Sequence, residues 1–133
     1  MIRPHGSEVL TPLIVADSVR RENLMEEAKT LPQLVVNSAA AANAVMLGAG
    51  YFTPLKGFMN KADVLGVSAE MRMSDGLFWP VPVANITTSD HVVNVGDRIA
   101  LRDPNIAGEP VMAIQEVESV EALSPEEIEQ IAL

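Results

Sequence analysis

The side chains of this sequence best suited to acid–base or metal chemistry are two histidines, His5 and His91, which lie far apart along the chain. There is no cysteine, so thiol chemistry, disulfides and cysteine-bound metals are excluded. His5 stands between a proline and a glycine, which favours a loop side chain that is hydrogen-bonded to backbone over a ligand or a base. His91 follows Ser89 and Asp90 in a polar turn, and we expect it to be exposed to solvent.

Carboxylates and glycines supply no catalytic pattern either. Glu26-Glu27 and Glu126-Glu127 fall on expected amphipathic helices, where charged runs are usually solvated faces. Glu116 and Glu118 lack any sign of a facing partner across a cleft. The glycines of 48–50 are followed by Tyr-Phe rather than by a phosphate-binding helix start, so a plain loop is favoured. The residues themselves therefore predict no catalytic, cofactor-binding or metal-binding side chain.

Two arginines, Arg98 and Arg102, stand where they could bind an anion. Side chains alternate along a strand, so both would point to one face of a strand over 98–102. Asp97 and Asp103 lie beside them in sequence. We expect local pairing with these aspartates to cancel the positive charge.

All five aromatic residues lie between positions 51 and 79, namely Tyr51, Phe52, Phe58, Phe78 and Trp79. One interpretation is a local aromatic core, in which the loop over 48–59 packs against Phe78 and Trp79. The other is a docking surface for another domain or subunit, since aromatics are enriched in interfaces. Both hold if the loop anchors on the core and exposes its other side. The candidate domain-interface residues are Tyr51, Phe52, Leu55 and Phe58.

Length and composition limit the remaining possibilities. A chain of 133 residues fits one domain, since domains usually hold about 100–200 residues. The 48% of hydrophobic residues argues against disorder. A net charge of −9 makes nucleic acid and anionic membranes unfavourable partners, because both attract positive surfaces. No apolar run is long enough to span a bilayer, which needs about 18 residues or more, and a cytoplasmic protein is the default expectation.

Helix caps, prolines and hydrophobic spacing predict an α+β fold. The expected order of helices, then strands, then a last helix favours a small, mostly antiparallel sheet curled into a partial β-barrel with flanking helices. Pro80 and Pro82 would keep one strand at an edge. The expected helices cover 17–30, 39–47, 60–71 and 126–133, and the expected strands cover 34–36, 77–86, 98–102 and 110–117. The apolar ending Ile131-Ala132-Leu133 is typical of a cut between domains, so we expect a fragment of a longer protein.

The aromatic loop and several motifs in order resemble the ATP sulfurylase (sulfate adenylyltransferase) family. Residues 50–59, G-Y-F-T-P-L-K-G-F-M, resemble a signature of this family that lies in its N-terminal domain. The similarity covers almost the whole chain, and the ordered motifs together are far more specific than any one of them. The other matching segments are P-H-G at 4–6, D-G at 75–76, W-P-V-P-V at 79–83, G-D-R-I-A-L-R-D-P at 96–104 and P-V-M-A-I at 110–114.

This resemblance implies a single N-terminal PUA-like domain over 1–133. The complete enzymes transfer the adenylyl group of ATP to sulfate with magnesium. Their active-site motifs Q-x-R-N-P, H-x-x-H and G-R-D-H do not occur here, so no catalytic residue, cofactor or metal is assigned to this chain. We expect it to support a downstream catalytic domain of the same polypeptide and a homo-oligomeric assembly. The alternatives are an RNA-binding PUA-type module, which the negative charge disfavours, and a stand-alone scaffold or interaction protein.

Overall fold

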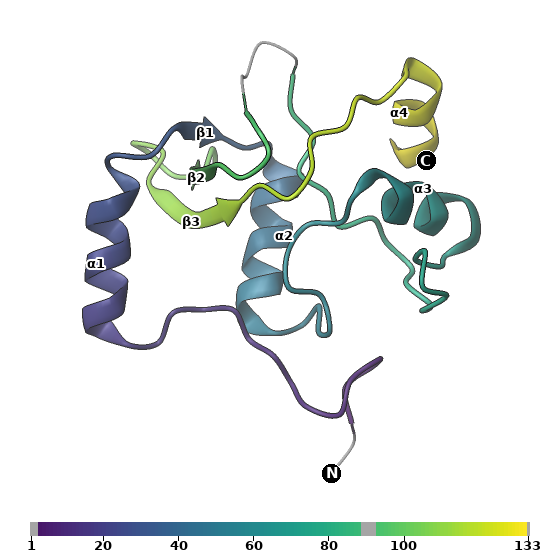
Figure 1. Ribbon diagram of the computed structural model, residues 1–133, viewed down its shortest axis with the longest axis horizontal. Coiled ribbons are helices and arrows are strands. Elements are labelled where there is room, and N and C mark those ends of the chain that lie inside the picture. Colours follow the sequence, from purple (N-terminus) through teal and green to yellow (C-terminus); the bar gives the residue numbers. More distant parts are fainter. Residues whose placement is uncertain (1–2, 89–92, 133) are drawn as a thin grey trace.

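A computed structural model describes residues 3–88 and 93–132 of the chain (Figure 1). Three helices and a short strand precede a hairpin, and a fourth helix follows it. Figure 1 shows α1 at one end of the molecule, the sheet and α2 in the middle, and α3 with α4 at the other end. The elements are α1 (Ser18–Ala28), β1 (Gln33–Val35), α2 (Ser38–Ala49), α3 (Lys61–Glu70), β2 (Arg98–Arg102), β3 (Val111–Glu116) and α4 (Pro125–Ala132).

Side-chain caps begin the first three helices where the sequence predicted them. Asp17, Asn37 and Asn60 each accept a hydrogen bond from the backbone N–H three residues later, at 2.8–2.9 Å. Helix α2 continues to Ala49, two residues beyond the predicted end. Its cap is Gly50, whose φ of 84° lies in the left-handed region that ends helices and suits glycine.

The predicted α+β class is confirmed, and the described residues form a three-stranded sheet of order β1-β2-β3. Strand β1 pairs in parallel with β2, and β2 pairs antiparallel with β3. The sheet is thus open and mixed, where a mostly antiparallel partial barrel was expected. The predicted strand over 77–86 is wrong. These residues, all described, form one isolated bridge from Phe78 to Arg72, because Pro80 and Pro82 lack the N–H that a ladder needs.

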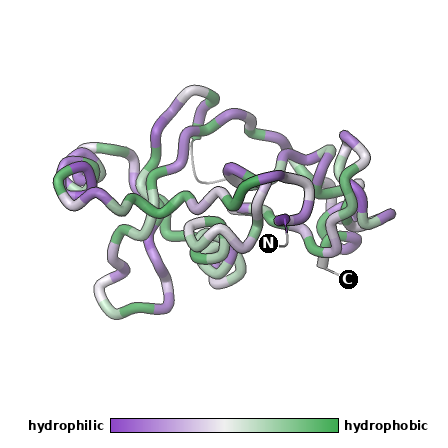
Figure 2. Tube along the Cα trace, turned by 90° about the horizontal axis from the view of Figure 1, so that it is seen from below, coloured by the Kyte–Doolittle hydropathy of each residue, from purple (hydrophilic) through white to green (hydrophobic). Residues whose placement is uncertain are grey.

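Most of the buried hydrophobic residues in the described part of the chain fall into two clusters. The first lies between the sheet and α2, where the almost fully buried Ala40 and Ala41 let the helix approach closely. The second brings together Leu47, Val67, Trp79 and Val83 from α2, α3 and the segment that follows α3. Phe58 packs against both clusters and joins them. In Figure 2, polar and apolar stretches alternate along the tube. No helix among the described residues is long and apolar enough to cross a bilayer.

A capping box begins the last helix, within one residue of the predicted start. Ser124 N–H donates to the Glu127 carboxylate at 2.9 Å, and Glu127 N–H donates to Ser124 Oγ at 3.2 Å. The ammonium of Lys61, at the start of α3, lies 3.2 Å from the same carboxylate. Its Nζ also donates to the Ala122 carbonyl at 2.9 Å. This group of bonds fixes α4 against α3.

Replacing Glu127 with glutamine should change how stability depends on pH. The Ser124 backbone N–H, and after it the Lys61 ammonium, hold the pKa of the Glu127 carboxyl below its usual 4.5. A lowered folded-state pKa stabilises the fold above pH 4.5, and that contribution is lost as the pH falls through the folded-state pKa. Urea midpoints should show E127Q less stable than the parent at pH 7, with the gap narrowing as the pH falls below 4.5. The neighbouring exposed Glu126→Gln is the control, and an equal gap for both variants would contradict the assignment.

Candidate functional site

His5 joins the N-terminal segment to the segment after α3. Its Nε2 lies 2.6 Å from the carbonyl oxygen of Phe78, and because a carbonyl can only accept, Nε2 carries the proton. The imidazole meets the Phe78 ring edge-on at 6.2 Å and the Trp79 ring at 5.9 Å. The prediction of a histidine bonded to backbone is confirmed for His5. The prediction for His91 falls outside the described residues.

Gly6, the next residue, makes this contact sterically possible. Its φ of 69° is left-handed, and a Cβ at this position would lie 3.0 Å from both terminal methyl groups of Leu77 and 3.3 Å from Pro54 Cδ. The segments 4–6, 51–54 and 77–80 therefore meet at one place.

Thr53 is the one buried polar residue of the core among those described, and it links the same region to the segment before α1. Its Oγ1 accepts the N–H of Thr11 at 3.0 Å and donates to the Gly50 carbonyl at 2.8 Å. One hydroxyl thus holds both the extended segment and the turn after α2.

Replacing Thr53 with valine should release the extended segment. The change keeps the shape but leaves the Thr11 N–H without its partner, at a cost of about 1–3 kcal/mol in the free energy of unfolding. The Gly50 carbonyl loses the hydroxyl but still accepts the backbone N–H of residue 53 at 3.2 Å. Thr11→Val is the matched control, because the Thr11 hydroxyl makes a 3.5 Å contact at an exposed position. Chemical denaturation of the two variants measures the difference, and equal stabilities would show that Thr53 does not hold the segment.

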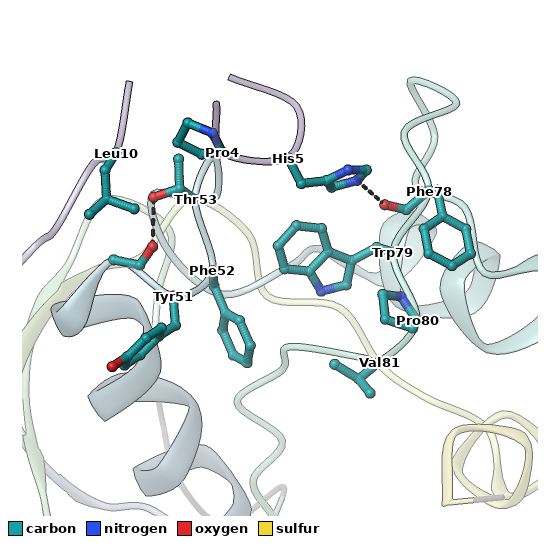
Figure 3. A pocket seen from close by; sticks show the side chains of 11 residues that line it. Pro4, His5, Leu10, Tyr51, Phe52, Thr53, Phe78, Trp79, Pro80 and Val81 are labelled. Atoms are coloured by element: carbon teal, nitrogen blue, oxygen red, sulfur yellow. Dashed lines mark hydrogen bonds between the residues drawn. The ribbon is translucent and has the colours of Figure 1, made fainter. Parts of the chain in front are cut away.

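The residues that make these contacts border an open groove of about 450 Å³ (Figure 3). Figure 3 shows Trp79 between His5 and Phe52, with Phe78, Pro80 and Val81 on one side and Leu10 and Tyr51 on the other. His5 is the one titratable imidazole in the lining, and none of the described lining residues is Asp, Glu, Lys or Arg. The groove is lined by Pro4, His5, Leu10, Gly50, Tyr51, Phe52, Thr53, Phe78, Trp79, Pro80 and Val81.

The candidate interface residues divide between the core and the surface. Phe52, Leu55 and Phe58 are partly buried against the second cluster, and the Phe52 ring meets the Trp79 ring edge-on at 5.8 Å. Tyr51 is 74% exposed, and in Figure 3 its ring points away from Trp79. The local aromatic core is therefore confirmed around Phe52 and Trp79. The docking surface stays a prediction, and Tyr51 is the member of the set best exposed for it.

Arg98 does not pair with the neighbouring Asp97. Its Nη1 forms an ion pair with Glu27 of α1, and its Nε lies 4.0 Å from Glu116 on β3. Asp97 instead accepts the backbone N–H of Asn94 at 3.0 Å and shapes the turn before β2. The expected local pairing is wrong because α1 brings the carboxylate of Glu27 to Arg98. Residues next to Arg98 in the sequence give no sign of this contact.

Arg102 likewise does not pair with Asp103. Its Nε donates to the Glu109 carbonyl at 2.6 Å and its Nη2 donates to the Gly108 carbonyl at 3.1 Å. Asp103 accepts the N–H of Asn105 in the hairpin turn at 2.9 Å. Both guanidinium groups therefore stabilise the sheet, and they form no anion site together.

No acidic or histidine cluster accompanies the groove. Within residues 3–88 and 93–132, no three His, Asp or Glu side chains gather closely enough to hold a metal ion. The groove residues are suited to contact with an apolar surface.

Comparison with known proteins agrees with this architecture. The family model described as PUA-like domain matches residues 2–131. The chain belongs to the PUA-like domain family. This PUA-like domain is 52% identical over 132 residues to a sulfate adenylyltransferase of Alcanivorax borkumensis, covering 99% of the chain and 33% of the relative. It is 49% identical to a sulfate adenylyltransferase of Allochromatium vinosum, covering 93% of the chain and 31% of that relative.

A solved structure shares the fold of this PUA-like domain. It is described as a hexameric APS kinase from Thiobacillus denitrificans, with a TM-score of 0.68 and 34% identity over 86% of this chain and 22% of that one. The chain spans about a third of the length of the sulfate adenylyltransferases it matches.

Proposed function

We propose that this PUA-like domain is the N-terminal, non-catalytic part of a sulfate adenylyltransferase. In the complete polypeptide, the adenylyl group of ATP passes to sulfate and pyrophosphate is released. The observation that carries the proposal is the 52% identity to a sulfate adenylyltransferase along 99% of the chain but only 33% of the relative. Neither alternative, an RNA-binding module or a stand-alone scaffold, has comparable support.

The surface of the domain supports a role within a larger protein. A folded monomer of 14.3 kDa is expected to expose about 6,800 Å², about 2,000 Å² less than the 8804 Å² exposed here. An excess of this kind fits a domain that is covered in part by the rest of a longer polypeptide.

The charges of the domain support a non-catalytic role. Transfer of an adenylyl group needs cations and hydrogen-bond donors positioned around the developing charge. In this chain 18 acidic residues oppose 9 basic ones, and Arg98 and Arg102 are engaged in the sheet. ATP, sulfate and magnesium would therefore bind to the rest of the polypeptide. Because that chemistry consumes ATP, we place the protein in the cytoplasm.

We also propose that the complete protein assembles as a homo-oligomer. A solved structure that shares this fold is described as hexameric. Size-exclusion chromatography with light scattering on the complete protein tests this assembly.

An assay of adenylyl-sulfate synthesis tests the non-catalytic role. The chain alone, supplied with ATP, sulfate, magnesium and a pyrophosphatase to remove the product, should give no more adenylyl sulfate than a protein-free blank. Synthesis above the blank would overturn the non-catalytic role and locate a site within this domain.

A further inference from the structure

Exposed apolar side chains gather along the extended segment before α1 and the adjoining end of α2. On a monomer, contiguous apolar surface of this kind marks an interaction site. The chain places 16 large hydrophobic side chains in exposed positions among those described, and five of them lie on this segment or just after α2: Val9, Leu10, Leu13, Ile14 and Tyr51.

Hydrogen bonds make this segment and the groove parts of one surface. The N–H groups of Leu13 and Ile14 both donate to the Gly48 carbonyl, at 3.1 and 3.0 Å. A Cβ on Gly50 would lie 3.2 Å from the Pro12 nitrogen, so the segment lies directly on the end of α2. Leu10 and Tyr51 then line the groove, with Phe78 and Val81 on its other side. We call this surface the groove face and define it as residues 9–14, Tyr51, Phe78 and Val81.

The groove face is held in shape by its own bonds. His5 fixes the side that carries Phe78, and Thr53 fixes the side that carries Leu10. A surface that is already ordered binds with a smaller loss of conformational entropy than a flexible one. The residues of the groove face are therefore placed to bind without refolding.

Charge indicates what kind of partner fits. Although Asp, Glu, Lys and Arg make up 20% of the chain, none of them belongs to the groove face or to the described lining of the groove. A phosphate-bearing or strongly charged ligand would find no counter-charge there. An apolar protein surface would find aromatic, proline and aliphatic contacts, which are typical of interface cores.

We propose that the groove face is the surface on which the remaining two-thirds of the polypeptide packs, an inference that rests on the proposed function. The sulfate adenylyltransferases that match this chain are about three times its length, so a covering segment is present in each of them. Phe52, Leu55 and Phe58 support the groove face from the core, whereas Tyr51 contacts the partner surface.

Cysteine labelling in a hybrid protein tests the groove face. In the hybrid, this chain replaces the matching third of the Alcanivorax borkumensis relative. The chain has no cysteine, so one introduced cysteine is its only thiol. The test variants are Leu10→Cys, Tyr51→Cys and Val81→Cys, and the controls are Val95→Cys and Val120→Cys, which are exposed to a similar extent away from the groove. All five positions are on the surface, so the substitutions leave the fold intact.

We expect a maleimide to label the three groove-face cysteines at least tenfold more slowly than the two controls, as measured on tryptic peptides by mass spectrometry. Equal rates at all five positions would overturn the proposal. Protection that disappears on dilution would also overturn it, because a second copy of the chain would then be the occupant. Adenylyl-sulfate synthesis by the same hybrid keeps the two hypotheses apart. An active hybrid with rapid groove labelling contradicts only the docking face, and a folded but inactive hybrid contradicts the proposed function.

Discussion

Replacing Gly66 with alanine should destabilise this domain by about 3 kcal/mol, a large part of the stability of a small domain. Gly66 lies inside α3, where an added methyl group usually helps. Here the new Cβ would lie 2.6 Å from the carbonyl oxygen of Arg72. That oxygen belongs to backbone and cannot rotate away as a side chain would.

The close approach at Gly66 follows from the way α3 ends. Met71 takes the left-handed φ of 55° and caps the helix. Its N–H is directed at the carbonyl oxygens of Val67 and Gly66. The chain therefore turns back across the helix immediately, and Arg72 passes over Gly66. Alanine at position 66 would push this turn away and loosen the segment that carries Phe78 and Trp79.

Gly48→Ala is the matched control for this prediction. Gly48 is also helical, and a Cβ there would meet nothing within 4 Å. The substitution should raise the free energy of unfolding by about 0.5–1 kcal/mol through helix propensity and a less flexible unfolded chain. Urea denaturation followed by circular dichroism compares both with the parent. If G66A were as stable as G48A, the carbonyl oxygen of Arg72 could not lie as close to Gly66 as the structure places it.

Trp79→Ala should have a second large effect, a loss of about 3–5 kcal/mol. Trp79 is 5% exposed and packs with Leu47, Val67 and Val83, so its removal leaves a cavity where α2, α3 and the following segment meet. The same truncation at Tyr51 should change stability by less than about 0.5 kcal/mol, because that ring lies at the surface.

These two variants separate the core role of the aromatic residues from their docking role. Circular dichroism is the appropriate probe, since Trp79 is the only tryptophan and its loss removes intrinsic fluorescence. A Tyr51→Ala variant as unstable as Trp79→Ala would place Tyr51 in the core. It would also remove Tyr51 from the groove face.

Local signals predicted the helices well, because their physical causes are local. Asp17, Asn37 and Asn60 cap the first three helices from within three residues, and Ser124 begins the last one with Glu127. The hairpin of β2 and β3 could also be predicted, since Asn105 and Gly108 lie in the turn between them. The prolines of 77–86 are compatible with an edge strand, but the structure forms no ladder over these residues.

Contacts between distant segments could not be predicted from the residues alone. The parallel pairing of β1 with β2 joins Leu34 to Leu101, and nothing near either residue indicates it. Arg98 and Glu27 are equally far apart in the sequence, and their ion pair takes the place of the expected pair between Arg98 and Asp97. For the same reason, clustering of the aromatic residues could be predicted, but the burial of Phe52 and the exposure of Tyr51 could not.

The central claim is that this domain supports sulfate adenylyltransferase chemistry carried out by the rest of its polypeptide. The most direct test is the rate of adenylyl-sulfate synthesis by the hybrid protein, compared with the unmodified Alcanivorax borkumensis relative. The 52% identity between the exchanged segments predicts that the hybrid folds and keeps its activity within about tenfold of the relative, a change of about 1.4 kcal/mol in the barrier. A hybrid that folds, as shown by cooperative thermal unfolding, but makes no adenylyl sulfate would contradict the account.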